Sequence, residues 1–154
     1  MVKILFLDID GVLNGHDGVA VLRRECCERL NRLIQATGAK VVLVSAWRYM
    51  ILDTGEYKSA MTCVGFSYML KTHGIDCEII GTTCSDEELM PRGEQVRKWM
   101  RDNPRPLRWC ILDDGDPEEF GYAPLLTDRL ITTPSDGGLQ DEHVERAIEL
   151  LGKD

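Results

Sequence analysis

Residues 2–14, VKILFLDIDGVLN, decide the fold of this protein. The stretch Val2–Leu7 is a short, mostly apolar run, which is typical of a strand buried on both faces of a parallel sheet. Asp8 and Asp10 follow it, and strand alternation would point both carboxylates the same way if the strand continued that far. Gly11 then permits a sharp turn. The carboxyl end of this strand is therefore a candidate site.

Strand-like and helix-like segments alternate through the rest of the 154 residues. This alternation predicts an α/β fold: a Rossmann-like, doubly wound, mainly parallel sheet with helices on both faces. The length fits one domain, residues 1–154. The further predicted strands are Lys40–Val44, Cys77–Gly81, Arg108–Leu112 and Leu130–Thr132. The first predicted helix carries Leu22, Cys26, Leu30 and Leu33 on one face and stops at Gly38. The other predicted helices are Ser59–His73, Arg92–Arg101 and Leu139–Leu151.

The composition argues against several classes of protein. With 44% hydrophobic and 29% charged residues, the chain has an ordinary globular composition, and no apolar run reaches the length of a membrane span. Its beginning lacks the pattern of a signal peptide, so a cytoplasmic location is expected. The net charge of −8 argues against an extended footprint on duplex nucleic acid, although one local basic site could hold a single phosphate.

The six cysteines contain no pair with C-x-x-C spacing. Cys110 lies inside an apolar run, and Cys26 falls on the apolar stripe of a predicted helix. The cysteines are therefore expected to be reduced, mostly buried thiols rather than ligands of a zinc site.

Polar residues follow four of the predicted strands. They are Asp8, Ser45, the pair Thr82/Thr83, and Asp113. In parallel α/β sheets, ligands bind at the carboxyl ends of the strands. The convergence of these residues on one edge predicts a shared site, and it weighs more than any single motif.

The spacing of Asp8 and Asp10 suits phosphoryl transfer. Two nearby carboxylates repel each other, and a divalent cation with a preference for hard oxygen ligands, such as Mg²⁺, would stabilise them. Asp8 could then attack phosphorus and form a covalent intermediate. Asp10 could protonate the leaving oxygen and later activate water. Taken alone, the pair is also compatible with a metal site without chemistry or with a solvated turn.

Other residues are candidates for binding the phosphate. Ser45, in VVLVSAWR, offers a hydroxyl at a strand end, although a serine there also commonly caps a turn or helix. Arg48 could hold a second phosphate, but it fits a surface position better. Gly11 is a further candidate for binding the phosphate. Arg92 begins a predicted helix, where a cation is unfavourable, so a role in neutralising the transferring phosphoryl group would explain it.

The acidic pair of WCILDDGDPEEF follows another buried strand. Asp114 is expected to bind Mg²⁺ directly. Asp113 is expected to orient a metal-bound water or Arg92. The sequence leaves open which of the two aspartates contacts the metal.

These motifs resemble those of the haloacid dehalogenase (HAD) superfamily of phosphatases. The superfamily order is D-x-D, Ser/Thr, Lys/Arg and an acidic pair, which here correspond to Asp8/Asp10, Ser45, Arg92 and Asp113/Asp114. The resemblance covers almost the whole chain and implies a HAD-like fold, a Mg²⁺ requirement and aspartyl-phosphate chemistry. It also implies that the backbone carbonyl of Asp10 binds the metal. Val12 replaces the threonine of the common D-x-D-G-T pattern.

A narrower resemblance rests on DIDGVLN, SAWR, RGEQVRKW and TTPSDGGL. These strings are similar to small HAD domains associated with RNA-repair proteins, which implies a nucleotide or a phosphorylated nucleic-acid end as substrate. The spacing between the motifs leaves room for a minimal cap at most, around Tyr49–Lys58, or for none. An open site of this kind suits a macromolecular end.

The sequence thus predicts a Mg²⁺-dependent phosphomonoester hydrolase. A receiver-like signalling module is disfavoured, because a receiver carries its adjacent acidic pair after the first strand and its phosphorylated aspartate after the third. A phosphate-binding module without catalysis, a phosphotransferase and a small-molecule (sugar) phosphatase remain alternatives. The oligomeric state stays open.

Overall fold

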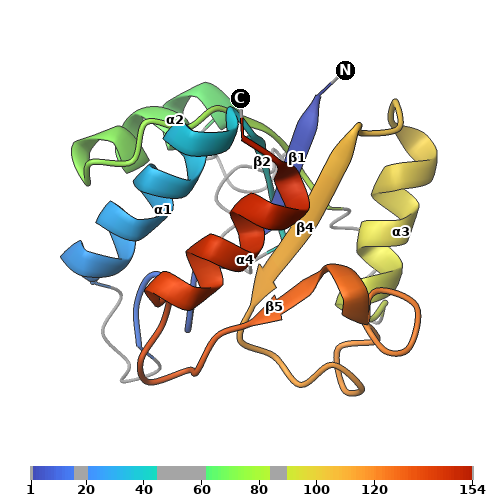
Figure 1. Cartoon of the computed structure of the whole chain (residues 1–154). Coiled ribbons are helices and arrows are strands. Elements are labelled where there is room, and N and C mark those ends of the chain that lie inside the picture. Colours follow the sequence, from blue (N-terminus) through green and yellow to red (C-terminus); the bar gives the residue numbers. More distant parts are fainter. Residues whose placement is uncertain (1, 16–20, 45–61, 84–89, 154) are drawn as a thin grey trace, which may run out of the picture.

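The computed structural model describes residues 2–15, 21–44, 62–83 and 90–153. Five strands form one sheet in the order β3-β2-β1-β4-β5, and every neighbouring pair is parallel (Figure 1). The predicted doubly wound α/β fold is therefore confirmed. The strands are β1 (Lys3–Leu7), β2 (Lys40–Leu43), β3 (Ile79–Thr82), β4 (Arg108–Asp113) and β5 (Leu130–Thr132).

Helices cover both faces of the sheet (Figure 1). Because successive residues of a strand point to opposite faces, Leu5 and Leu7 of β1 join one apolar cluster, and Ile4 and Phe6 join another. The first cluster lies under α1 (Arg24–Thr37), α2 (Cys63–Thr72) and α4 (Asp141–Leu151), and the second lies under α3 (Arg92–Asp102).

The ends of the helices follow local chemistry. α1 ends where Gly38 adopts a left-handed φ of 63° and its N–H donates to the carbonyl of Ile34, as the glycine predicted. α4 begins two residues later than expected, because the N–H of Leu139 donates to Val12 and Gln140 caps the helix. α2 begins after its cap Thr62, and residues 59–61 of that predicted helix lie outside the described residues.

The position of β1 creates the site. From β1 the chain adds β2 and β3 on one side, then crosses the sheet through α3 and places β4 on the other side of β1. The strand order thus reverses between β1 and β4, and ligands bind beside the carboxyl ends of strands at such a point. The backbone N–H of Asp8 donates to Leu112 at 2.9 Å, which extends this pairing beyond the end of β1.

Two sequence expectations concern the rest of the molecule. Within the part of the chain that the structure describes, no helix has the length and apolar character needed to cross a bilayer. The five cysteines of the described residues are unpaired thiols, and all but Cys63 are buried.

Candidate active site

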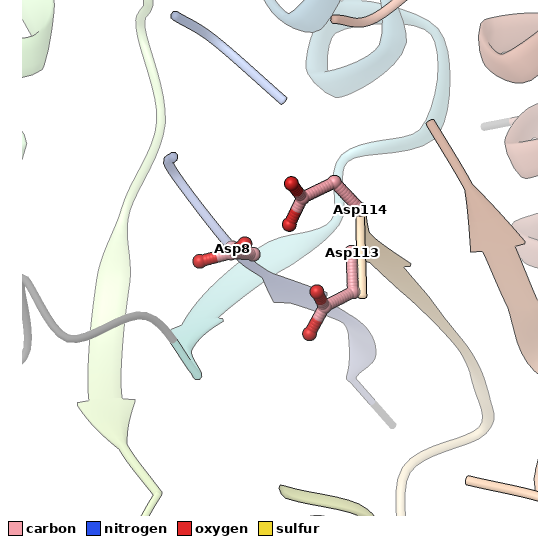
Figure 2. Close-up of side chains that lie close together, drawn as sticks. All are labelled: Asp8, Asp113 and Asp114. Carbon is pink, nitrogen blue, oxygen red and sulfur yellow. The ribbon is translucent and has the colours of Figure 1, made fainter. Parts of the chain in front are cut away.

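Three carboxylates meet where β1 and β4 end (Figure 2). Asp8 follows β1, Asp113 is the last residue of β4, and Asp114 comes next. One oxygen from each lies within 4.8 Å of the other two. The parallel register explains the meeting, because Leu7 pairs with Leu112 and so brings the next residues of both strands together. Three of the four predicted metal ligands therefore form one group.

Arg92, the first residue of α3, faces this group. Its Nη1 lies 3.1 and 2.9 Å from the two carboxylate oxygens of Asp113 and 3.3 Å from Oδ2 of Asp8. The guanidinium also lies over the ring of Phe120, 4.7 Å from its centroid. Burial opposes the charge on Arg92, but Asp8 and Asp113 outweigh it and raise the pKa of the guanidinium. The two carboxylates thus offset the unfavourable helix position of this cation.

Close packing fixes the start of α3. A Cβ at Gly93 would lie 2.1 Å from the carbonyl oxygen of Gly121, so only glycine fits there, and the N–H of Gly93 donates to Phe120. Gln95 is buried, accepts from the hydroxyl of Thr83 and donates to the carbonyl of Met90. Thr83, which follows β3, therefore holds the helix that carries Arg92.

Asp113 has its hydrogen-bonding capacity occupied by the protein. Oδ1 accepts from the N–H of Gly115 at 2.9 Å, and Oδ2 accepts from the hydroxyl of Tyr122 at 2.6 Å. Arg92 contacts both oxygens. Asp113 is fully buried, so these bonds also offset the cost of burying its charge. Burial and the carboxylate of Asp113 raise the pKa of Tyr122 well above its ordinary value, which keeps the phenol a donor.

Asp8 is less well compensated. Its side chain is 2% exposed, and its Oδ1 has no hydrogen-bond partner among the residues that the structure describes. Burial, together with the charges of Asp113 and Asp114, raises the pKa of Asp8 to about 8, although Arg92 acts in the opposite direction. Among the described residues, Arg92 thus contacts two of the three carboxylates, Asp8 and Asp113, and one buried oxygen of Asp8 is left over. This arrangement fits a divalent cation with a preference for oxygen ligands, such as Mg²⁺, which the group of Asp8, Asp113 and Asp114 could hold.

The turn after Asp8 packs against the same group. Gly11 has a left-handed φ of 78°, and a Cβ there would lie 2.0 Å from Oδ2 of Asp114. The N–H of Gly11 donates to Oδ1 of Asn14 at 3.1 Å, and its carbonyl accepts from the hydroxyl of Thr133 at 2.8 Å. The structure thus gives Gly11 a packing role, and its predicted contact with phosphate stays a prediction.

The other predicted residues are placed as follows. Asp10 is partly buried, and its Oδ1 accepts from Nδ2 of Asn14 at 2.8 Å. Its carboxylate is not part of the three-carboxylate group, and its carbonyl as a metal ligand stays a prediction. Ser45, Arg48 and the possible cap segment around Tyr49–Lys58 lie outside the described residues.

Sequence reasoning missed several residues that support the site, among them Asn14, Phe120, Tyr122 and Thr133. Asn14 had a signal, because it is a polar residue directly after the apolar pair Val12-Leu13 inside the quoted motif. Thr133 lies in TTPSDGGL, a string that carries the narrower family resemblance but no indication of a partner for this hydroxyl. Phe120 and Tyr122 belong to an irregular segment, where no periodicity indicates which side chains turn inward.

Comparison with known proteins gives one result. The family described as "HAD domain in Swiss Army Knife RNA repair proteins" matches residues 4–144, which include all four motifs. Searches among curated proteins and among solved structures returned no match. The match covers most of the chain and agrees with the sheet, the motif order and the acidic group. The chain therefore belongs to the family of HAD domains found in Swiss Army Knife RNA repair proteins.

Proposed function

We propose that this protein is a Mg²⁺-dependent phosphomonoester hydrolase that forms an aspartyl-phosphate on Asp8. The observation that carries the proposal is the buried carboxylate of Asp8, which lies beside Arg92 within the group of three aspartates. Membership of a HAD family supports a phosphatase or related hydrolase in general. The nucleophile, the metal and the substrate class are specific to the proposal.

In the first step, a carboxylate oxygen of Asp8 attacks phosphorus as the bond from phosphorus to the leaving oxygen breaks. Asp10 gives its proton to that oxygen. Arg92 contacts Asp8 and so lies where it can offset negative charge on the phosphoryl oxygens. Bound Mg²⁺ would supply further positive charge, which lets an anionic nucleophile approach an anionic phosphate.

In the second step, water attacks the phosphorus of the aspartyl-phosphate. Asp10, now a carboxylate, accepts a proton from that water. The bond from phosphorus to Asp8 breaks, inorganic phosphate leaves and the carboxylate of Asp8 is restored. Asp113 holds Arg92 through both steps by the contacts described above.

The proposed substrate is a nucleotide or a phosphorylated nucleic-acid end. The family description, which refers to RNA repair, supports this class. The net charge of −8 suits a single terminal phosphate better than a long duplex. The proposal includes the cytoplasmic location expected from the sequence.

Phosphate release tests the proposal. The panel contains 3′- and 5′-phosphorylated RNA and DNA oligonucleotides, nucleoside monophosphates, sugar phosphates and an aryl phosphate, each with Mg²⁺ and with chelator. The variants are Asp8→Asn and Asp128→Asn, which alters an exposed aspartate of η2 (Thr127–Arg129). Mg²⁺-dependent release that Asp8→Asn abolishes and Asp128→Asn retains would support the proposal.

The same panel separates the alternatives. Preference for a sugar phosphate would indicate a small-molecule phosphatase. Transfer of labelled phosphate to an added alcohol or nucleoside, in place of release, would indicate a phosphotransferase. No release from folded, Mg²⁺-loaded protein would overturn the proposal and leave a phosphate-binding module.

A further inference from the structure

Asn14 is a buried polar residue to which the mechanism above gives no role. It is 1% exposed, so its amide must find partners inside the protein. Oδ1 accepts from the N–H of Gly11 at 3.1 Å, and Nδ2 donates to Oδ1 of Asp10 at 2.8 Å. Only one orientation of the amide satisfies both contacts, because Gly11 offers a donor and Asp10 an acceptor.

The turn has other supports besides Asn14. The hydroxyl of Thr133 donates to the carbonyl of Gly11 at 2.8 Å, and the N–H of Leu139 donates to the carbonyl of Val12 at 2.8 Å. A residue needed only to cap the turn would use its oxygen on Gly11. The second contact of Asn14 is different, because it reaches the side chain of Asp10, the proposed acid and base.

We propose that Asn14 is a positioning residue that orients Asp10 for proton transfer. By holding Oδ1, it fixes the plane of the Asp10 carboxylate, which then delivers a proton to the leaving oxygen and later removes one from water. The inference rests on the proposed function. It extends that function to Asn14, whose hydrogen bonds go to Gly11 and Asp10 rather than to the three aspartates or Arg92.

The role predicts a dependence on the leaving group. Phenol is a far weaker acid than 2,4-dinitrophenol, so phenolate needs a proton as it departs and dinitrophenolate does not. The ratio kcat/KM covers the steps up to loss of the leaving group, so it reports the acid role of Asp10 alone. Misplacing Asp10 should therefore reduce kcat/KM for phenyl phosphate selectively.

Two substitutions separate the contacts of Asn14. Asn14→Asp keeps an oxygen for the N–H of Gly11, but as a carboxylate it cannot donate to Asp10. Asn14→Ala loses both contacts and avoids a new charge. For either variant, kcat/KM is expected to fall roughly 10- to 100-fold with phenyl phosphate and less than about threefold with 2,4-dinitrophenyl phosphate. Asp10→Asn should show the same selectivity more strongly.

Thr133→Val is the matched control, because it removes a hydrogen bond to the same turn without touching Asp10. It should change kcat/KM for both substrates by the same factor. A second readout reports the role of Asp10 as the base. Because breakdown of the aspartyl-phosphate should slow in Asn14→Ala, this variant should release a burst of dinitrophenolate close to the enzyme concentration from 2,4-dinitrophenyl phosphate. Thermal unfolding of each variant identifies any that do not fold.

The outcomes distinguish the inference from the proposed function. If a folded Asn14→Ala lost kcat/KM equally on both substrates and gave no burst, the role of Asn14 would be overturned. Turnover by the wild type would still support the hydrolase. No turnover of either substrate by wild type would overturn both. Selectivity in the Asn14 variants together with none in Thr133→Val would support the inference.

Discussion

The two ends of strand β1 carry opposite charges in very different surroundings. At the amino end, the ammonium group of Lys3 donates to the carbonyls of Thr37 and Gly152, each at 2.9 Å. These carbonyls lie at the carboxyl ends of α1 and α4, where a cation is favourable. At the other end, Asp8 is buried beside two further carboxylates, and one of its oxygens finds no hydrogen-bond partner in the described part of the chain.

The two ends of β1 therefore differ in what their charges do. At the amino end, groups of the protein itself satisfy the charge of Lys3. At the carboxyl end, the described residues bring three carboxylates together. A bound cation or a proton would offset this negative charge, which is typical of sites where function costs stability. Substitutions at each end of β1 test this contrast.

Asp8→Asn should have the largest effect, because it should lower turnover but raise the stability of the metal-free protein. Loss of the proposed nucleophile is expected to lower turnover on the order of 10⁴-fold or more. In chelator at pH 8, however, the variant should be more stable than wild type by about 1–3 kcal/mol, because a neutral amide replaces a poorly compensated carboxylate. Urea denaturation measures the second effect, with Asp128→Asn as the exposed control. A less stable Asp8→Asn would contradict the contrast.

Arg92→Met should lower both activity and stability. Phosphate release is expected to fall about 10²–10³-fold, because a positive group beside the phosphoryl oxygens is lost. The free energy of unfolding should fall by about 3–5 kcal/mol, because Asp113 stays buried without its cation. Arg24→Met is the matched control, since its Arg24–Glu28 ion pair is exposed and contributes little. Unchanged stability of the Arg92 variant would show that Tyr122 and Gly115 compensate Asp113 without it.

Stability without metal should depend on pH through Asp8. The pKa of this carboxyl rises from 3.8 to about 8 on folding, so between these values the folded protein retains a proton that the unfolded chain releases. The free energy of unfolding therefore falls as pH increases across this window, by up to about 1.4 kcal/mol per pH unit for this one group. Asp8→Asn should reduce this slope.

Added Mg²⁺ should oppose this loss of stability at higher pH. The cation competes with the proton for Asp8, so the stabilisation that it gives should grow from pH 5 to pH 8. Thermal unfolding with Mg²⁺ or chelator at several pH values measures both effects. A Mg²⁺ effect of the same size in wild type and Asp8→Asn would place the cation elsewhere.

The sequence predicted the fold because its strands are short apolar runs and its helices have regular spacing. The same regularity placed Asp8 and Asp113 together, since both follow buried strands that pair in parallel. Arg92 was noticeable because a cation at the start of a helix is unfavourable. The structure brings these three residues and Asp114 together, and their catalytic roles stay proposals.

The supporting residues could not be predicted in this way. Tyr122 reaches Asp113 only because the irregular segment between them turns back, which depends on packing such as that of Phe120 against Gly115. Thr133 reaches Gly11 across 122 residues of sequence, through the pairing of β5 with β4. Such contacts depend on tertiary structure, whereas periodicity reports only local structure.

Lys3→Met should have the smallest effect, and only on stability. It removes the donor to two helix ends, so the free energy of unfolding should fall by about 1–2 kcal/mol. The loss should be the same with Mg²⁺ and with chelator, and phosphate release by the folded variant should be unchanged, because Lys3 lies at the opposite end of β1 from Asp8. Lys153→Met, at an exposed position, is the matched control. A loss of activity in folded Lys3→Met would mean that the two ends of β1 are coupled.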